Sequence, residues 1–198
     1  MTNPVWHEPL ISRTQRWNKH GISGTTVWLT GLSGSGKSTI ANELARELLN
    51  TSRLAYILDA DNLRHGLNSG LGYTDDDRAE NIRRVAEVAC LFADAGIVAI
   101  VPIISPFIAS REHARKIHND NQLRFIEVHV ATSIDECERR DTKGLYAKVR
   151  SGAMTGLSGV DSVYEPPKSP EVIVCANSEP LEQSVAIIMK HLLTKAGK

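Results

Sequence analysis

The sequence lacks an excess of charge of either sign, because 23 lysines and arginines face 23 aspartates and glutamates in 198 residues. A balanced chain has no overall field that would recruit nucleic acid or an acidic membrane, so neither partner is expected. The three cysteines, Cys90, Cys137 and Cys175, have no C-x-x-C spacing and are expected to be reduced thiols. Neither a secretory signal nor a run of 18 apolar residues occurs. These absences predict a cytoplasmic protein with no membrane span.

A complete phosphate-binding loop, of the form G-x-x-x-x-G-K-[ST], occupies residues 31–39. Its glycines let backbone N–H groups approach phosphate oxygens. Lys37 can reach the β- and γ-phosphates, and the Ser38 hydroxyl is placed to ligate Mg²⁺. A predicted strand precedes the loop and a predicted helix follows it, so the helix N-terminus faces the phosphates. The pattern predicts binding of a nucleoside triphosphate by Gly31, Leu32, Ser33, Gly34, Ser35, Gly36, Lys37, Ser38 and Thr39.

The chain is long enough for one α/β domain, which we expect at 26–198. Residues 1–25 combine prolines and glycines with scattered charges and predict an irregular N-terminal arm. Trp6 and Trp17 could dock this arm on the body or on a second subunit. The stretch 141–167 is polar, rich in glycine and without apolar periodicity. A loop of this length in a compact domain is usually functional, and here it predicts a lid.

Strands and helices alternate along the predicted domain. Strands are expected at 26–30, 54–58, 97–101, 125–130 and 172–175. Helices are expected at 38–49, 77–95, 110–118, 134–140 and 181–193. This order predicts an α/β fold of the P-loop kinase type, with three layers in which helices cover both faces of a parallel sheet. Ligands of such sheets bind beyond the carboxyl ends of the strands, where the phosphate loop, Asp59–Asp61, Ser105 and 141–167 fall.

The phosphate loop alone does not separate GTPases and motor ATPases from small-molecule kinases. A GTPase would need a guanine-reading Asn-Lys-x-Asp after the loop, but Asn18-Lys19 is the only Asn-Lys pair and precedes it. Chain length and a single sheet favour a kinase that transfers phosphate to a metabolite.

Further segments narrow the choice: 59–68 (DADNLRHGLN), 71–74 (LGYT), 77–84 (DRAENIRR), 104–107 (ISPF), 140–148 (RDTKGLYAK) and 164–167 (YEPP). Together with the phosphate loop they closely resemble the adenylylsulfate kinase (APS kinase) family, over nearly the whole chain. The resemblance implies that the ATP γ-phosphate is transferred to the 3′-hydroxyl of adenylyl sulfate, giving ADP and 3′-phosphoadenylyl sulfate in sulfate activation. It also implies a Mg²⁺ requirement, a homodimer and a mobile lid. Functional coupling to ATP sulfurylase is a further expectation.

Two aspartates follow the second predicted strand, across from the phosphate loop. Asp61 is the candidate base for the substrate hydroxyl, because a carboxylate there can accept its proton. Asp59 is a candidate for the metal shell. The alternative for both is that they cap the following helical turn, which aspartate does well.

Cations and one amide from several segments are expected to converge on the phosphate and sulfate of the acceptor. Arg64 follows the second strand, and Arg78 and Asn81 share one face of the next helix because they lie three positions apart. Lys143 is expected to contact adenylyl sulfate, and Arg140 the adenine or phosphates of ATP. The alternative is that 141–167 is an ordinary basic loop.

Ile104 and Ser105 lie where a buried strand ends, and both are expected to contact the substrate. In the family the serine that matches Ser105 has been described as a phosphoserine intermediate. In-line transfer needs no protein nucleophile, which favours a contact role for the hydroxyl. Tyr73 and Met154 stand where the family typically has two phenylalanines that sandwich the substrate adenine, and tyrosine and methionine can also contact it.

Two alternatives to an active APS kinase remain open. One is a kinase of the same fold that acts on a nucleoside, gluconate or shikimate. The other is a non-catalytic nucleotide-binding module that serves as a partner or regulatory subunit of an ATP sulfurylase.

Overall fold

A computed structural model gives the structure of this chain and describes residues 4–5 and 7–194. At its centre lies a five-stranded sheet in the order β2-β3-β1-β4-β5, and every neighbouring pair is parallel. The strands are β1 (Thr25–Thr30), β2 (Ala55–Ile57), β3 (Val98–Pro102), β4 (Arg124–Val130) and β5 (Val172–Val174). The five predicted strands are therefore confirmed, with ends that shift by a residue or two.

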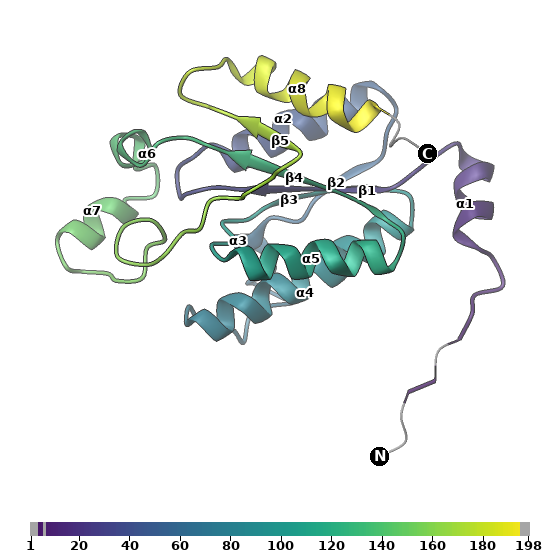
Figure 1. Cartoon of the computed structure of the whole chain (residues 1–198), viewed down its shortest axis with the longest axis horizontal. Helices are drawn as coiled ribbons and strands as arrows, with labels where there is room; N and C mark the ends of the chain where they lie inside the picture. The colour runs from purple at the N-terminus through teal and green to yellow at the C-terminus, as the bar shows by residue number, and fades with distance from the viewer. Residues whose placement is uncertain (1–3, 6, 195–198) are drawn as a thin grey trace.

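Helices cover both faces of the sheet (Figure 1). One face carries α2 (Lys37–Asn50) and α8 (Leu181–Leu193), and the other carries α4 (Asp75–Asp94) and α5 (Ile108–Asp120). This arrangement confirms the predicted three-layer α/β fold. No helix among the described residues is both long enough and apolar enough to cross a membrane.

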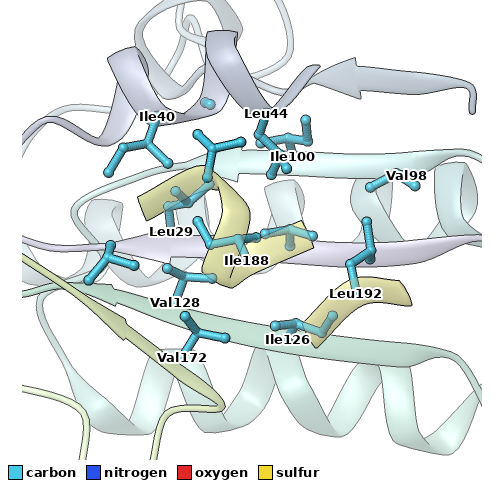
Figure 2. Close-up of a cluster of buried hydrophobic side chains, with 14 of the residues drawn as sticks. Leu29, Ile40, Leu44, Val98, Ile100, Ile126, Val128, Val172, Ile188 and Leu192 are labelled. Atoms are coloured by element: carbon cyan, nitrogen blue, oxygen red, sulfur yellow. The ribbon is translucent and has the colours of Figure 1, made fainter. Parts of the chain in front are cut away.

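The core consists of two apolar layers because side chains of a strand point alternately to opposite faces. Figure 2 shows the first layer, in which α2 and α8 pack on the sheet through Ile40, Leu44, Ile188 and Leu192. On the opposite face, Trp28 of β1 is fully buried in a cluster with side chains of α4 and α5. All six residues of β1, the central strand, are buried, and the phosphate loop begins where this strand ends.

Helix starts follow local capping. The Thr74 hydroxyl accepts from the Asp77 N–H, and three aspartates fill the first turn, so α4 begins at Asp75 rather than at the predicted residue 77. Ser133 caps α6 (Ile134–Arg140), which has the predicted bounds. Two short helices were not expected: α3 (Ala60–Leu63), and α7 (Leu145–Arg150), which lies inside the stretch predicted as a loop at 141–167.

The N-terminal arm is more ordered than its prolines and glycines indicate, because it contains α1 (Arg13–His20). A capping box between Ser12 and Gln15 starts this helix, and Gly21 ends it in the left-handed conformation. The Trp17 indole N–H donates to the Asp94 carbonyl at 3.0 Å, so this tryptophan docks the arm on the body. Trp6, the other tryptophan predicted to dock the arm, lies outside the described residues.

Candidate active site

A cavity of about 330 Å³ opens at the carboxyl edge of the sheet. Four loops and the first turns of α2 and α4 build its wall, and α3 contributes the side beyond β2. Most predicted site residues line it, including Ser33, Gly34, Gly36, Lys37, Ser38, Thr39, Asp59, Asp61, Arg64, Tyr73, Arg78, Asn81, Ile104, Ser105, Arg140 and Lys143. Gly31, Leu32, Ser35 and Met154 are not among its lining residues.

Lys37 lies in the phosphate loop at the first position of α2. Its ammonium donates to the carbonyls of Gly31 and Leu32 at 2.9 and 2.7 Å. Burial lowers the pKa of Lys37 to about 8, because removal from water disfavours the charged form. Gly36 precedes it with φ 102°, a left-handed conformation that favours glycine. The loop is thus shaped for close approach of an anion.

Two side chains from elsewhere in the fold support the phosphate loop. The Tyr146 hydroxyl of α7 donates to the Ser33 carbonyl at 2.9 Å, and the Thr132 hydroxyl donates to the Ser35 carbonyl at 2.8 Å. Burial raises the pKa of Tyr146, which keeps its hydroxyl protonated as a donor. Neither contact could be predicted, because each partner lies about a hundred residues from the loop.

The two aspartates after β2 have different surroundings. Asp59 caps α3, because one carboxylate oxygen accepts from the N–H groups of Asp61 and Asn62 at 2.9 and 3.2 Å. Asp61 lies inside α3 and pairs with the Lys143 ammonium across the cavity. The capping alternative therefore applies to Asp59, and the Asp61 carboxylate faces a cation from 141–167.

The cations predicted to bind the acceptor also organise the protein. Arg64 donates to the carbonyls of Leu71 and Gly72, both at 3.0 Å, and its guanidinium lies 4.3 Å from the centre of the Tyr73 ring. Tyr73 itself is 70% exposed, so one ring face is held while the rest is open to a ligand. The guanidinium lies over one face of the ring, and both side chains line the cavity.

Arg78 ties α4 to the stretch 141–167. Its guanidinium donates to the Tyr73 carbonyl at 2.9 Å, the Ser158 hydroxyl at 3.0 Å and the Gly156 carbonyl at 2.6 Å. Met154, two positions before Gly156, is half-buried and does not line the cavity. The structure therefore does not bring Met154 and Tyr73 together on the two sides of an adenine site.

Ser105 is buried, and its hydroxyl forms a hydrogen bond with a core side chain. It accepts from the Trp28 indole N–H at 3.1 Å, and its backbone has φ 42°. Its neighbour Ile104 accepts from the Thr30 hydroxyl through its carbonyl at 2.6 Å. The serine therefore shapes the cavity wall through its backbone more than through its hydroxyl.

Arg140 lines the cavity, whereas Arg111 lies behind it and contacts the Ser105 carbonyl. Arg140 lines the cavity beside Gly36 and donates to Glu136 and to the Ala176 carbonyl, both at 2.7 Å. Arg111 was missed by sequence reasoning. It is buried, and it donates to Glu127 at 2.9 Å, to the Glu165 carbonyl at 2.6 Å and to the Ser105 carbonyl.

The residues present fit Mg²⁺ bound together with nucleotide phosphates. The described residues contain no group of three or more acidic, histidine or cysteine side chains that could hold a metal alone. The Ser38 hydroxyl and the carboxylates of Asp59 and Asp61 nevertheless line one cavity. Mg²⁺ is usually bound by one or two such oxygens plus substrate phosphates, so this donor set is sufficient.

Comparisons with known proteins agree with this site. The family model described as Adenylylsulphate kinase matches residues 23–175. An adenylyl-sulfate kinase from Clostridium kluyveri is 49% identical over 98% of this chain and 96% of its own length. One from Staphylococcus epidermidis is 45% identical over 95% of this chain and 94% of its own.

Solved structures show the same likeness. The Mycobacterium tuberculosis APS kinase in complex with AMPPNP and APS has a TM-score of 0.84 and 47% identity, covering 86% of this chain and 98% of its own. These relatives confirm the prediction that the chain is an adenylyl-sulfate kinase. None of them supports the alternative of a non-catalytic nucleotide-binding module. The chain belongs to the adenylylsulphate kinase family.

Proposed function

We propose that this enzyme transfers the γ-phosphate of ATP to the 3′-hydroxyl of adenylyl sulfate with Asp61 as the general base. The observation that carries the proposal is the shared cavity: Lys37 of the phosphate loop and Asp61 line it together, and Lys143 contacts Asp61 there. The donor side of the cavity is the phosphate loop with Arg140. The acceptor side consists of Arg64, Tyr73, Arg78, Asn81, Ile104, Ser105 and Lys143, with Met154 as a further candidate.

The reaction follows from these positions. The 3′-oxygen of the acceptor attacks the γ-phosphorus, and its proton passes to the Asp61 carboxylate. The bond from the γ-phosphorus to the β–γ bridging oxygen breaks, and ADP leaves. Lys37 and the N–H groups at the start of α2 stabilise the charge that develops on the phosphate oxygens. Ser38 and Asp59 would hold Mg²⁺, which would supply neutralisation of the negative charge on the nucleotide phosphates.

Segment 141–167 acts as the lid in this proposal. Arg78 already holds two of its residues, and Arg111 holds its far end at Glu165, so the segment is tied to the acceptor side at two places. Closure over both nucleotides excludes water, which would otherwise compete with the acceptor hydroxyl. We assign 26–198 to the kinase domain and 1–25 to the arm, although β1 begins one residue earlier at Thr25.

The test is a coupled ADP-release assay with purified enzyme, ATP and Mg²⁺. Adenylyl sulfate is compared with a nucleoside, gluconate and shikimate at matched concentrations. We expect ADP release with adenylyl sulfate alone, together with a product phosphorylated at the 3′-oxygen by ³¹P NMR. Turnover of gluconate or shikimate in preference to adenylyl sulfate would overturn the proposal.

A homodimer, functional coupling to ATP sulfurylase and a cytoplasmic location complete the proposal. A relative from Thiobacillus denitrificans is hexameric, with a TM-score of 0.64 and 28% identity, and this chain spans 29% of it. Light scattering on the purified protein tests the dimer. A rise in flux when ATP sulfurylase is added to the assay tests the coupling.

A further inference from the structure

Two asparagines meet behind one wall of the cavity. Asn81 lines the cavity from α4, whereas Asn68 is fully buried in the turn that follows α3. The Asn68 Nδ2 group donates to Asn81 Oδ1 at 2.9 Å. Asn68 does not line the cavity, and its side chain donates to neither the phosphate loop nor the proposed base, so it has no direct part in the transfer described above.

The backbone of Asn68 is fixed on both sides. Its N–H donates to the Leu63 carbonyl at 2.9 Å, and its carbonyl accepts from the Leu71 N–H at 3.1 Å. The turn therefore holds Asn68 in place without help from its side chain. The side-chain amide serves Asn81 alone among the described residues.

The unpartnered oxygen of Asn68 indicates which way the two amides point. Asn68 Oδ1 is buried and has no hydrogen-bond partner among the described residues. If both amides were turned around, the Asn68 NH₂ group would occupy that unpartnered place. Buried N–H groups are left without an acceptor more rarely than buried carbonyls without a donor. The observed orientation, with Nδ2 of Asn68 toward Asn81, is the favoured one.

This orientation sets what Asn81 offers to a ligand. Its Oδ1 is occupied by Asn68, and its Nδ2 donates to no residue that the structure describes. The two side-chain N–H groups of Asn81 are thus available to donate to a ligand in the cavity. Arg64, Arg78 and Lys143 line the same cavity and are also donors only, so apart from the Asp61 carboxylate that pairs with Lys143 the acceptor side has the character of an oxyanion site.

We propose that Asn68 is a positioning residue: it locks the Asn81 amide with its N–H groups toward the cavity and so makes this wall select an oxyanion. The identity of that oxyanion, the phosphate or sulfate of adenylyl sulfate, rests on the proposed function. Without Asn68 the Asn81 amide could turn its oxygen toward the anion, which would repel it. The effect falls on the acceptor and leaves the ATP side unchanged.

The first test is Asn68→Leu, which keeps a similar shape and removes both the donor and the unpartnered oxygen. The substitution also leaves the buried Asn81 Oδ1 without its donor, so Tm should fall by roughly 2–10 °C. We expect KM for adenylyl sulfate to rise about tenfold, the loss of one hydrogen bond to a charged group, with KM for ATP unchanged. Asn62→Leu, at an exposed asparagine of α3, is the matched control and should leave both KM values unchanged.

A double-mutant cycle separates positioning from packing. In an Asn81→Ala background, Asn68→Leu should have no further effect on KM for adenylyl sulfate, because its target is gone. Equal effects in both backgrounds, or a parallel rise of both KM values, would overturn the proposal. Unaltered KM for adenylyl sulfate in the single variant would overturn it as well.

A measurement on the unmodified enzyme covers the case in which the variants fail to fold. The side-chain NH₂ signals of Asn81, assigned by NMR, should shift on addition of adenylyl sulfate and not on addition of ATP. Unshifted signals in an enzyme that turns over adenylyl sulfate contradict the role of Asn68. An enzyme that does not turn it over contradicts the proposed function instead.

Discussion

Lys143 and Asp61 form an ion pair between the start of segment 141–167 and helix α3, although 82 positions separate them in sequence. Their side chains are 58% and 68% exposed. Exposed pairs of this kind contribute about 0.2–1 kcal/mol, so a ligand can displace the lysine at little cost. The pair therefore keeps a cation beside the proposed base while leaving that cation free to move to the acceptor.

Replacement of Lys143 by alanine tests whether this lysine contacts the acceptor. We expect KM for adenylyl sulfate to rise about tenfold or more, since a charged contact is lost, while KM for ATP changes less than twofold. Steady-state rates with each substrate varied in turn measure both values. Lys148→Ala, at an exposed lysine of α7, is the control. A Lys143→Ala enzyme with the parental KM for adenylyl sulfate would remove the lysine from the acceptor site.

The low pKa of Lys37 predicts proton uptake when ATP binds. Burial lowers the pKa to about 8, and phosphate oxygens raise it again because they favour the ammonium form. Below about pH 7 the lysine is already protonated, and above pH 8 it must gain a proton on binding. ATP affinity should therefore fall by up to about tenfold per pH unit as pH rises above 8.

Calorimetry in buffers of different ionisation enthalpy measures that uptake at pH 9, where ATP itself is fully ionised. Lys37→Arg, whose guanidinium stays protonated, is the control and should show none. A binding enthalpy independent of the buffer at pH 9 in the parental enzyme would contradict the assignment to Lys37.

Ser105→Ala separates a structural hydroxyl from a phosphorylated one. The substitution leaves the buried Trp28 N–H without its acceptor, which costs about 1–3 kcal/mol of stability. For a chain of this size, such a loss lowers the Tm by roughly 2–10 °C. Activity at 20 °C should stay within tenfold of the parental value. An inactive variant, with a phosphoserine isolated from the parental enzyme, would reverse this view.

Arg111→Ala should be the most destabilising of these substitutions. It removes the bonds from one buried guanidinium to Glu127, Ser105 and Glu165, and leaves the Glu127 carboxylate buried with only a long contact to Arg115. Breaking a buried ion pair lowers the free energy of unfolding by about 3–5 kcal/mol. Urea unfolding of the variant and of the parental enzyme measures this loss. Arg115→Ala, at a half-exposed arginine, should cost much less. Equal losses in the two variants would show that burial of Arg111 is not decisive.

The sequence predicted the sheet and the helices that pack on it because buried periodicity is a local signal. Helix α8 and helix α6 have the predicted bounds, since an apolar stripe or a serine cap marks them. Helix α1 has no buried residue and so no apolar stripe, although its capping box was readable. The left-handed Gly144 that starts α7 looks the same in sequence as any loop glycine.

The site residues that belong to short sequence motifs could be predicted from the sequence. Those that act through contacts between distant parts of the chain could not. Lys37, Asp61 and Arg78 lie in such motifs, and all line the cavity. Tyr146, Arg111 and Asn68 act through partners that only the fold brings near, so their residue type and spacing carry no signal. The sequence alone does not separate the capping role of Asp59 from a metal-binding one, because aspartate suits both a metal and a helix start.

The most direct test of the account is the turnover of Asp61→Asn with adenylyl sulfate, ATP and Mg²⁺, measured beside its ATP affinity. Asparagine keeps the shape of the side chain but cannot accept the proton of the 3′-hydroxyl. The account predicts that kcat falls by about 10²–10⁴-fold, the usual contribution of a general base, while the Kd for ATP stays within a few-fold. Near-normal turnover by Asp61→Asn would contradict it.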